Sequence, residues 1–244
     1  MNLPAESLPE PLNPDDPAWL RWPRQVWEHR AWLRGSPSGL QLLEWLHDPG
    51  KYQAVLGRAG YRRALQALMA AAEPQDCEAA GFAFDRATPG WGRWAGEALQ
   101  IEWQLSPDGQ HRAVLWAEDG WPGALLWLDG QPCPGWGEEP PGTCATSGRW
   151  VDACHFAVEV PGPPEHPGQL PLPGAPLGAV LGLLLIDARS GDHIVLQPTA
   201  HEHWEAPWLS QDGGRWRLHP DRVSCEQGLP PVREWVGHTP LQSH

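Results

Sequence analysis

The run HEHWE at residues 201–205 is the group of neighbouring side chains best suited to bind a metal ion. Alternate residues of a β-strand project from one face, so in a strand His201 and His203 would share a face, with Glu205 next along it. Imidazole nitrogens and carboxylate oxygens are ligands that zinc takes in proteins. The run therefore predicts a divalent metal site at His201 and His203, and the alternative is a polar loop.

A second group of reactive side chains lies further up the chain. Cys154 and His155, beside Asp152, have the residue types of a nucleophile and a base. Neighbouring residues of a strand point to opposite faces, so in the strand expected over 150–160 the thiol and the imidazole would not meet. We therefore expect Cys154 to be a small core residue and His155 to lie at the surface.

The remaining motifs give no catalytic signature. The five cysteines are odd in number and lack C-x-x-C spacing, which favours reduced thiols over a disulfide framework. Cys133, Cys144 and Cys154 with His155 are irregularly spaced for zinc. The sequence contains no phosphate-binding glycine loop, nucleophile elbow, HExxH helix or dinucleotide fingerprint. We predict no catalytic residues and no cofactor, with a divalent metal at the 201–203 histidines as the alternative.

Charge and hydropathy narrow the choice of partner and compartment. The formal net charge of −13 argues against nucleic acid, because phosphate binding needs a basic face, and favours a basic protein partner. The apolar run at 174–186 is too short to span a bilayer and predicts a strand buried on both faces. The first residues lack the basic region and apolar stretch of a signal peptide. We therefore expect a cytoplasmic protein with no membrane partner.

The first third of the sequence predicts helices. Residues 1–15 are Pro-rich and acidic and predict a flexible tail. The Asp-Asp-Pro run at 15–17 is a good helix start, and apolar residues recur at helical spacing from 52 to 72. These patterns predict a helical subdomain of two or three helices over 16–73.

After Pro74 the pattern changes to short apolar runs separated by Gly, Pro and Asp, which is typical of antiparallel strands. We therefore predict an antiparallel β domain over 79–244. The runs SPDG at 106–109 and SQDG at 210–213 predict turns, with the serine accepting a local hydrogen bond. The predicted strands are Leu99–Leu105, Arg112–Ala117, Ala124–Leu128, Trp150–Val160, Leu177–Asp187, His193–Leu196, Arg215–Leu218 and Val232–Val236.

The stretch from the SPDG turn through the run ALLWLDG at 124–130 resembles a blade of β-propeller proteins, and the segment 183–191 resembles the strand–turn step of the same repeats. The resemblance implies antiparallel hairpins in sequence. The resemblance covers about a third of the chain, whereas a closed propeller needs at least four blades of about 40 residues. The expected class is therefore α+β, with an N-terminal helical segment packed on a mainly antiparallel part that is meander-like or sandwich-like and not a full propeller.

The chain holds 17 tryptophans against three phenylalanines and two tyrosines. Each indole has a large apolar face and an N–H that needs a partner, so we expect many of them at the boundary of a core. Aromatic anchors on an acidic scaffold favour a non-enzymatic protein-binding module, of the immunity or inhibitor type that neutralises a basic partner. The alternatives are a metal-dependent enzyme using His201 and His203, and a carbohydrate-binding protein with indoles stacked on sugars.

Overall fold

The computed structural model describes residues 46, 49–84, 88, 90–96, 99–118, 123–137, 144–169 and 177–236. These residues fall in two compact units. The first ends at Gly96 and takes in Asp129–Gln131, and the second comprises Glu97–Leu128 and the chain from Pro132 on. The pairings between the described strands are antiparallel and close no barrel, which confirms the β-rich, antiparallel character. The predicted tail 1–15 and the helices expected before residue 46 lie outside the described residues, and the predicted domain limits stay predictions.

Helix α4 (Pro49–Ala71) confirms the helix predicted over 52–72. A kink at Gly57 divides it into two helical stretches. Gly57 has a φ of 70°, in the left-handed region that glycine adopts without steric cost because it lacks a Cβ. Helix α5 (Pro74–Ala79) begins at a proline and is capped by a reciprocal pair of hydrogen bonds between Glu73 and Asp76. The strands of the first unit, which pair with each other, are β1 (Ala83–Phe84) and β2 (Trp91–Ala95).

The second unit contains three groups of strands. The first group is a meander of β3 (Leu99–Leu105), β4 (Arg112–Glu118) and β5 (Leu125–Leu128), followed by the short β6 (Gln131–Pro132). The second is a sheet of β7 (Gly148–Trp150), β8 (His155–Pro161), β9 (Leu181–Asp187) and β10 (His193–Leu196), in the order β10-β9-β8-β7. The third is β11 (Trp208–Asp212), β12 (Arg215–His219) and β13 (Arg233–Val236), with helix α6 (Arg222–Glu226) between the last two.

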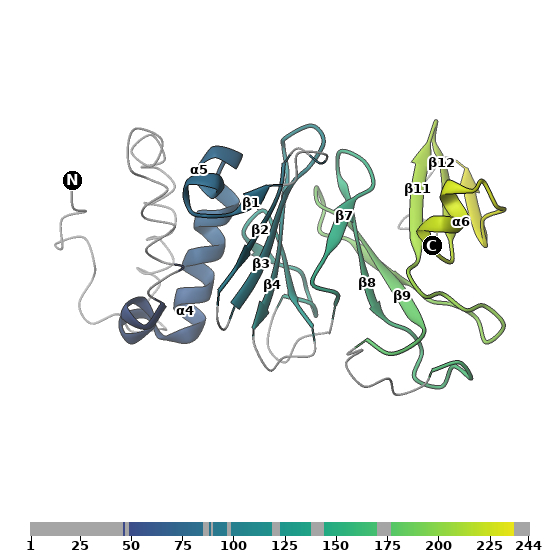
Figure 1. Cartoon of the computed structure of the whole chain (residues 1–244), viewed down its shortest axis with the longest axis horizontal. Helices are drawn as coiled ribbons and strands as arrows, with labels where there is room; N and C mark the ends of the chain where they lie inside the picture. Colours follow the sequence, from purple (N-terminus) through teal and green to yellow (C-terminus); the bar gives the residue numbers. More distant parts are fainter. Residues whose placement is uncertain are drawn as a thin grey trace. The chain divides into compact units, whose positions relative to one another are not determined.

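The four-stranded sheet is the middle layer of the second unit (Figure 1). Alternate residues of a strand point to opposite faces, and here both faces are covered. Phe156 and Ile186 pack toward Leu126 in one core, whereas Ala157 and Leu185 belong to a second core with the third group of strands. Strand β9 is buried along nearly its whole length, which confirms the prediction of a strand buried on both faces.

Turn chemistry explains where the hairpins begin. In the predicted SPDG turn the Gly109 N–H donates to the Ser106 carbonyl at 2.8 Å, and the Ser106 hydroxyl accepts from the His111 N–H at 2.9 Å. The turn predicted at 210–213 is wrong, because Ser210 to Asp212 continue strand β11. The hairpin turns instead on Gly213 and Gly214, whose φ values of 54° and 78° suit a two-residue loop of the mirror-image type.

The strand predicted over Trp150–Val160 is also wrong. It is a hairpin, in which β7 ends at Trp150, β8 begins at His155 and the two strands pair antiparallel. Strands β2 and β11 were not predicted at all. No helix within the described ranges is long and apolar enough to cross a membrane.

Candidate functional site

The turn that joins β7 to β8 is closed by the side chain of Asp152. Its Oδ1 accepts the backbone N–H groups of Cys154 at 2.9 Å and His155 at 2.8 Å, and the Val151 N–H donates to the His155 carbonyl at 2.8 Å. An aspartate that accepts N–H groups two and three residues on makes a tight turn without glycine or proline. This turn brings together three side chains that a continuous strand would separate.

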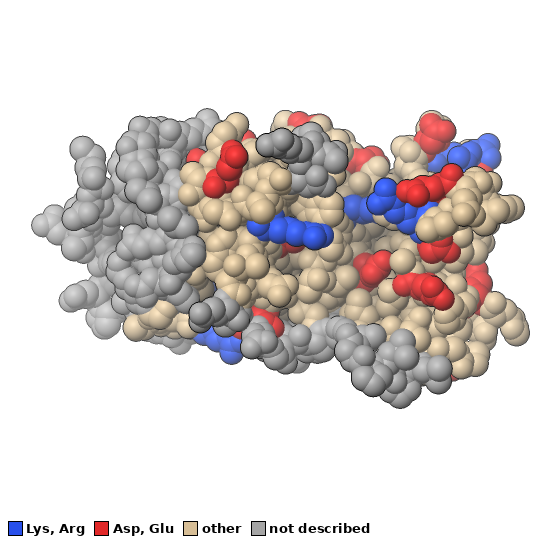
Figure 2. Space-filling view, in the orientation of Figure 1, with Lys and Arg blue, Asp and Glu red and all other residues tan. Residues whose placement is uncertain are grey.

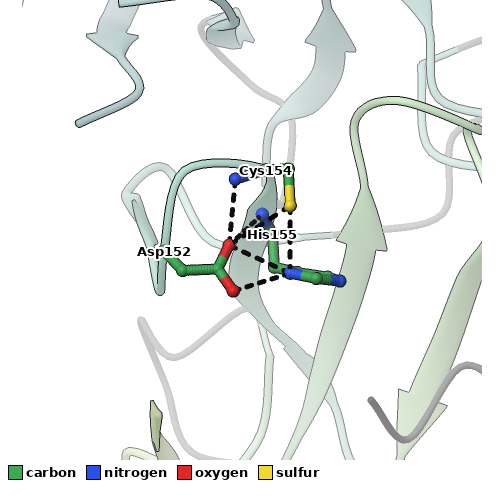
Figure 3. Close-up of side chains that lie close together, drawn as sticks. All are labelled: Asp152, Cys154 and His155. Carbon is green, nitrogen blue, oxygen red and sulfur yellow. Dashed lines mark hydrogen bonds and ion pairs between the residues drawn. The ribbon is translucent and has the colours of Figure 1, made fainter. Parts of the chain in front are cut away.

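We call Asp152, Cys154 and His155 the turn cluster (Figure 3). The Nδ1 of His155 lies 2.9 and 2.8 Å from the two carboxylate oxygens of Asp152 and 3.4 Å from the Sγ of Cys154. His155 is only 4% exposed, whereas Cys154 is half-buried. The expected positions of these two residues are therefore reversed, and the thiol and imidazole do meet. The error came from treating 150–160 as one strand.

The other ring nitrogen of His155 faces a second carboxylate. His155 and Asp187 are register partners across β8 and β9, and Nε2 lies 3.9 Å from Asp187 Oδ2. Arg189 holds that carboxylate through Nε at 2.9 Å and Nη2 at 2.6 Å. The Trp216 ring packs against the imidazole edge to face, with ring centroids 5.0 Å apart and ring planes at 84°. His155 Nε2 is buried and has no hydrogen-bond partner.

The electrostatics of the turn cluster favour an aspartate and a neutral thiol. Burial raises the pKa of Asp152, but the hydrogen bonds from His155 and from the two backbone N–H groups outweigh it and hold that pKa at about 2. Burial, together with the negative charge of Asp152, raises the pKa of the Cys154 thiol to about 11. The hydrogen bonds of Arg189 lower the pKa of Asp187. At neutral pH the cluster therefore carries a carboxylate beside an un-ionised thiol.

This geometry does not make a nucleophile–base pair. In a catalytic triad the carboxylate binds one ring nitrogen and the nucleophile the other. Here Asp152 and Cys154 both approach Nδ1, and a carboxylate can only accept, so Nδ1 carries the proton and donates it to Asp152. A protonated nitrogen cannot take the thiol proton. The expectation that Cys154 and His155 do not meet is therefore wrong, and the absence of catalytic residues stays a prediction.

The predicted metal ligands lie in a loop and not in a strand. His201 and His203 are both exposed between β10 and β11, and His203 Nε2 is 3.6 Å from Glu205 Oε1. The nearest histidine ring to His203 is His166, with centroids 6.4 Å apart. Among the described residues the turn cluster is the only group of three or more His, Cys, Asp or Glu side chains whose ligand atoms lie within 4.8 Å of one another. The site at His201 and His203 stays a prediction.

His166 is already fully bonded. Its Nε2 lies 2.8 Å from the Glu202 carbonyl and 3.1 Å from the Thr199 carbonyl, and its Nδ1 accepts the Gly168 N–H at 3.0 Å. Carbonyl oxygens only accept, so Nε2 carries the proton and Nδ1 does not. His166 thus anchors the loop that carries His201 and His203, and it is not free to bind a metal.

Three of the other cysteines are core residues, namely Cys77, Cys133 and Cys144. Cys133 and Cys144 are buried in the core between the first two groups of strands, and Cys144 Sγ donates to the Ala124 carbonyl at 2.8 Å. Burial raises the pKa of each thiol to about 12. Neither shares a metal-ligand group with Cys154 or His155.

A different kind of surface lies at the end of the third group of strands. The large apolar side chains that the structure exposes all fall within residues 223–236: Val223 at 57%, Leu229 at 48%, Val232 at 37% and Val236 at 75%. We call these four residues the C-terminal apolar surface. It belongs to helix α6, strand β13 and the segment between them.

Two arginines pack on the indole of Trp208, and one of them, Arg222, precedes Val223 in helix α6. The guanidinium groups of Arg149 and Arg222 lie 3.5 and 5.1 Å from the ring centroid of Trp208, and Arg149 also donates to the Leu209 carbonyl. Figure 2 shows basic and acidic side chains interleaved in the region of β11 and β12. No tryptophan in the described ranges is exposed, so none of those indoles offers a fully open face to a sugar ring.

Comparisons with known protein families, with curated proteins and with solved structures found no match for this chain.

Proposed function

We propose that the chain is a cytoplasmic, non-enzymatic protein-binding module, of the immunity or inhibitor type, that neutralises a basic protein. On this proposal the helical subdomain 16–73 packs on the β domain as a rigid scaffold. The observation that carries the proposal is the C-terminal apolar surface, because the exposed large apolar side chains of the described chain gather on one short segment.

An exposed cluster of this kind favours a contact with another protein. Single exposed apolar residues are ordinary, whereas a contiguous group rimmed by polar side chains marks an interaction surface. Arg222, which precedes Val223 in helix α6, is paired with Glu226 at 2.6 Å and lies 5.1 Å from the ring centroid of Trp208. Tryptophan and arginine are the residue types that most often supply binding energy at interfaces.

The net charge of the chain favours a basic protein as the partner. A net charge of −13 attracts a basic protein over long range and raises the rate of encounter. The apolar surface itself carries balanced charges, since Arg215 is paired with Glu234 and Arg233 with Glu202. On this proposal the net charge speeds the encounter with the partner, and the exposed valines and leucine make the close contact.

The alternative is a metal-dependent enzyme that uses His201 and His203. The observation in its favour is the short separation of His203 and Glu205, which supplies an imidazole and a carboxylate within one loop. A carbohydrate-binding function has no comparable support among the described tryptophans.

Photo-crosslinking in the native cell tests the proposal. A photoreactive residue at position 223 or 236 should give an adduct with one basic protein, whereas the same residue at Ser190, which is exposed in the turn after β9, should not. The purified complex should weaken at least ~10-fold with Val223→Asp plus Val236→Asp, because charges replace buried apolar contacts. It should also associate more slowly as salt is raised.

The matched control is Ser190→Asp plus Ala200→Asp, which adds the same charge at exposed positions elsewhere. Adducts that are equally strong at position 190, an adduct only with a second copy of the chain, or a complex insensitive to the double valine variant would refute the proposal.

A further inference from the structure

We propose that the turn cluster is a zinc site, with Asp152, Cys154 and His155 as three protein ligands and a fourth position open to solvent. This inference is independent of the protein-binding function and of the loop histidines. It rests on the separations of the three ligand atoms, on the second carboxylate behind His155 and on the burial of the site.

The three ligand atoms are spaced as a tetrahedral ion requires, with one exception. Zinc bond lengths of about 2.0 Å to N or O and about 2.3 Å to S place tetrahedral ligands roughly 3.3 Å apart for N···O and roughly 3.5 Å apart when sulfur is one of the pair. Cys154 Sγ lies 3.4 Å from His155 Nδ1 and 3.5 Å from Asp152 Oδ1. Only the Nδ1···O separation of 2.8–2.9 Å is shorter, and it is the hydrogen bond that an ion would replace.

The second carboxylate has the position of an outer partner for a metal-bound histidine. A histidine that binds zinc through one nitrogen commonly donates its other N–H to a carboxylate, which fixes the ring and its tautomer. Asp187 lies 3.9 Å from His155 Nε2 and is itself fixed by Arg189. Without an ion Nδ1 carries the proton, and buried Nε2 lacks a hydrogen bond. With zinc on Nδ1 the ring would carry its proton on Nε2, which faces Asp187 Oδ2 at 3.9 Å and would need a small movement to donate a hydrogen bond to it.

Charge balance also favours a divalent cation. A thiolate at Cys154 and the carboxylate of Asp152 carry two negative charges, and the Asp187–Arg189 pair is neutral. A bound divalent cation would favour the thiolate form of Cys154, whose proton would be released to solvent. Sulfur, imidazole and carboxylate together suit zinc better than magnesium or calcium, which take oxygen ligands.

The fourth coordination position of such an ion would be free of protein ligands. Three protein ligands would leave the fourth position of a tetrahedral ion to water or to a small ligand. Asp152 and Cys154 are half-buried, so the ion is reached from solvent, whereas the ring of His155 packs against Trp216. The site therefore holds an ion against a rigid hairpin with one side accessible to a small ligand.

Cobalt(II) and zinc(II) binding to tag-free, full-length protein test the proposal. Cobalt should bind with a stoichiometry of about one and give the thiolate-to-metal charge-transfer band of a cysteine ligand. Cys154→Ser should abolish that band and weaken zinc binding, measured by competition with a chelating dye, at least ~10-fold. Asp187→Asn should leave the band in place but weaken zinc ~10–100-fold, as expected for an outer partner.

Two control variants separate this site from the other candidates. Cys225→Ser changes another half-buried cysteine, and His201→Ala plus His203→Ala removes the loop histidines; both should bind cobalt as the natural chain does. Absence of the charge-transfer band in the folded natural protein, its persistence in Cys154→Ser, or loss of binding only in the double histidine variant would each overturn the proposal.

Discussion

The turn at 151–155 and the loop at 199–205 both place histidine beside carboxylates, but their surroundings differ. In the turn, Asp152 binds the imidazole of His155 and two backbone N–H groups, and the ring is 4% exposed. In the loop, His201 and His203 are exposed. Backbone geometry and burial, and not the spacing of residue types in the sequence, therefore bring ligand side chains together.

The loop at 199–205 carries the exposed His203 and is held by the buried His166 from another segment. His166→Ala removes hydrogen bonds to two carbonyls and one N–H in a buried position, so we expect a loss of about 3 kcal/mol of unfolding free energy. His203→Ala should cost less than ~0.5 kcal/mol, because that side chain is 49% exposed. Urea denaturation of both variants provides the measurement. Equal losses would contradict the assigned roles.

Removal of a carboxylate should also cost more unfolding free energy in the turn than in the loop. Asp152→Ala leaves two backbone N–H groups and the His155 ring without their acceptor and should cost about 2 kcal/mol. Glu205→Ala, in the loop, should change stability by less than ~0.5 kcal/mol, since the Glu205 side chain is 76% exposed. Thermal melts in the presence of a chelator compare the two. A neutral Asp152→Ala variant would mean that the turn closes without its side chain.

The stabilisation that Asp152 gives to the turn should depend on pH. The folded pKa of Asp152, about 2, lies below its ordinary value of 3.8. Its stabilisation is therefore complete above pH ~4 and is lost as the pH falls towards ~2. The shift is worth roughly 1–2 kcal/mol after allowance for partial exposure. In metal-free protein, the difference in unfolding free energy between the natural chain and Asp152→Asn should shrink over this window; a constant difference would contradict the assigned pKa.

The smallest expected effect is on thiol reactivity. Asp152→Asn removes a negative charge next to Cys154 and should raise its rate of alkylation at pH 8 by about threefold to tenfold, since the thiol pKa falls. Mass spectrometry of the alkylated peptide reports the rate for each cysteine. Cys133 and Cys144, which are buried elsewhere in the core, serve as internal references whose rates should not change.

The strands were predictable where apolar runs are bounded by turn residues. Strands β3 and β10 have the predicted limits, and the SPDG turn forms as expected. The hairpin on Gly213 and Gly214 was missed although two successive glycines are a known signal for it. Strand β11 is too polar at Ser210 to Asp212 to give an apolar pattern.

The three residues of the turn cluster were singled out in the sequence, but their geometry was predicted wrongly for a physical reason. Val151 to Cys154 contain neither glycine nor proline, and the turn is made by the side chain of Asp152. The available signal was an aspartate two residues before a possible chain reversal, which is weak by itself. The partnership of His155 with Asp187 depends on the register of β8 and β9, which local patterns do not specify.

The most direct test of the difference between the turn and the loop is the tautomer of His155, read from long-range proton–nitrogen NMR correlations. Without metal, His155 should carry its proton on Nδ1, and added zinc should move it to Nε2 while the signals of His201 and His203 stay unchanged. An Nε2 proton on His155 before zinc is added, or zinc shifts confined to His201 and His203, would contradict the account.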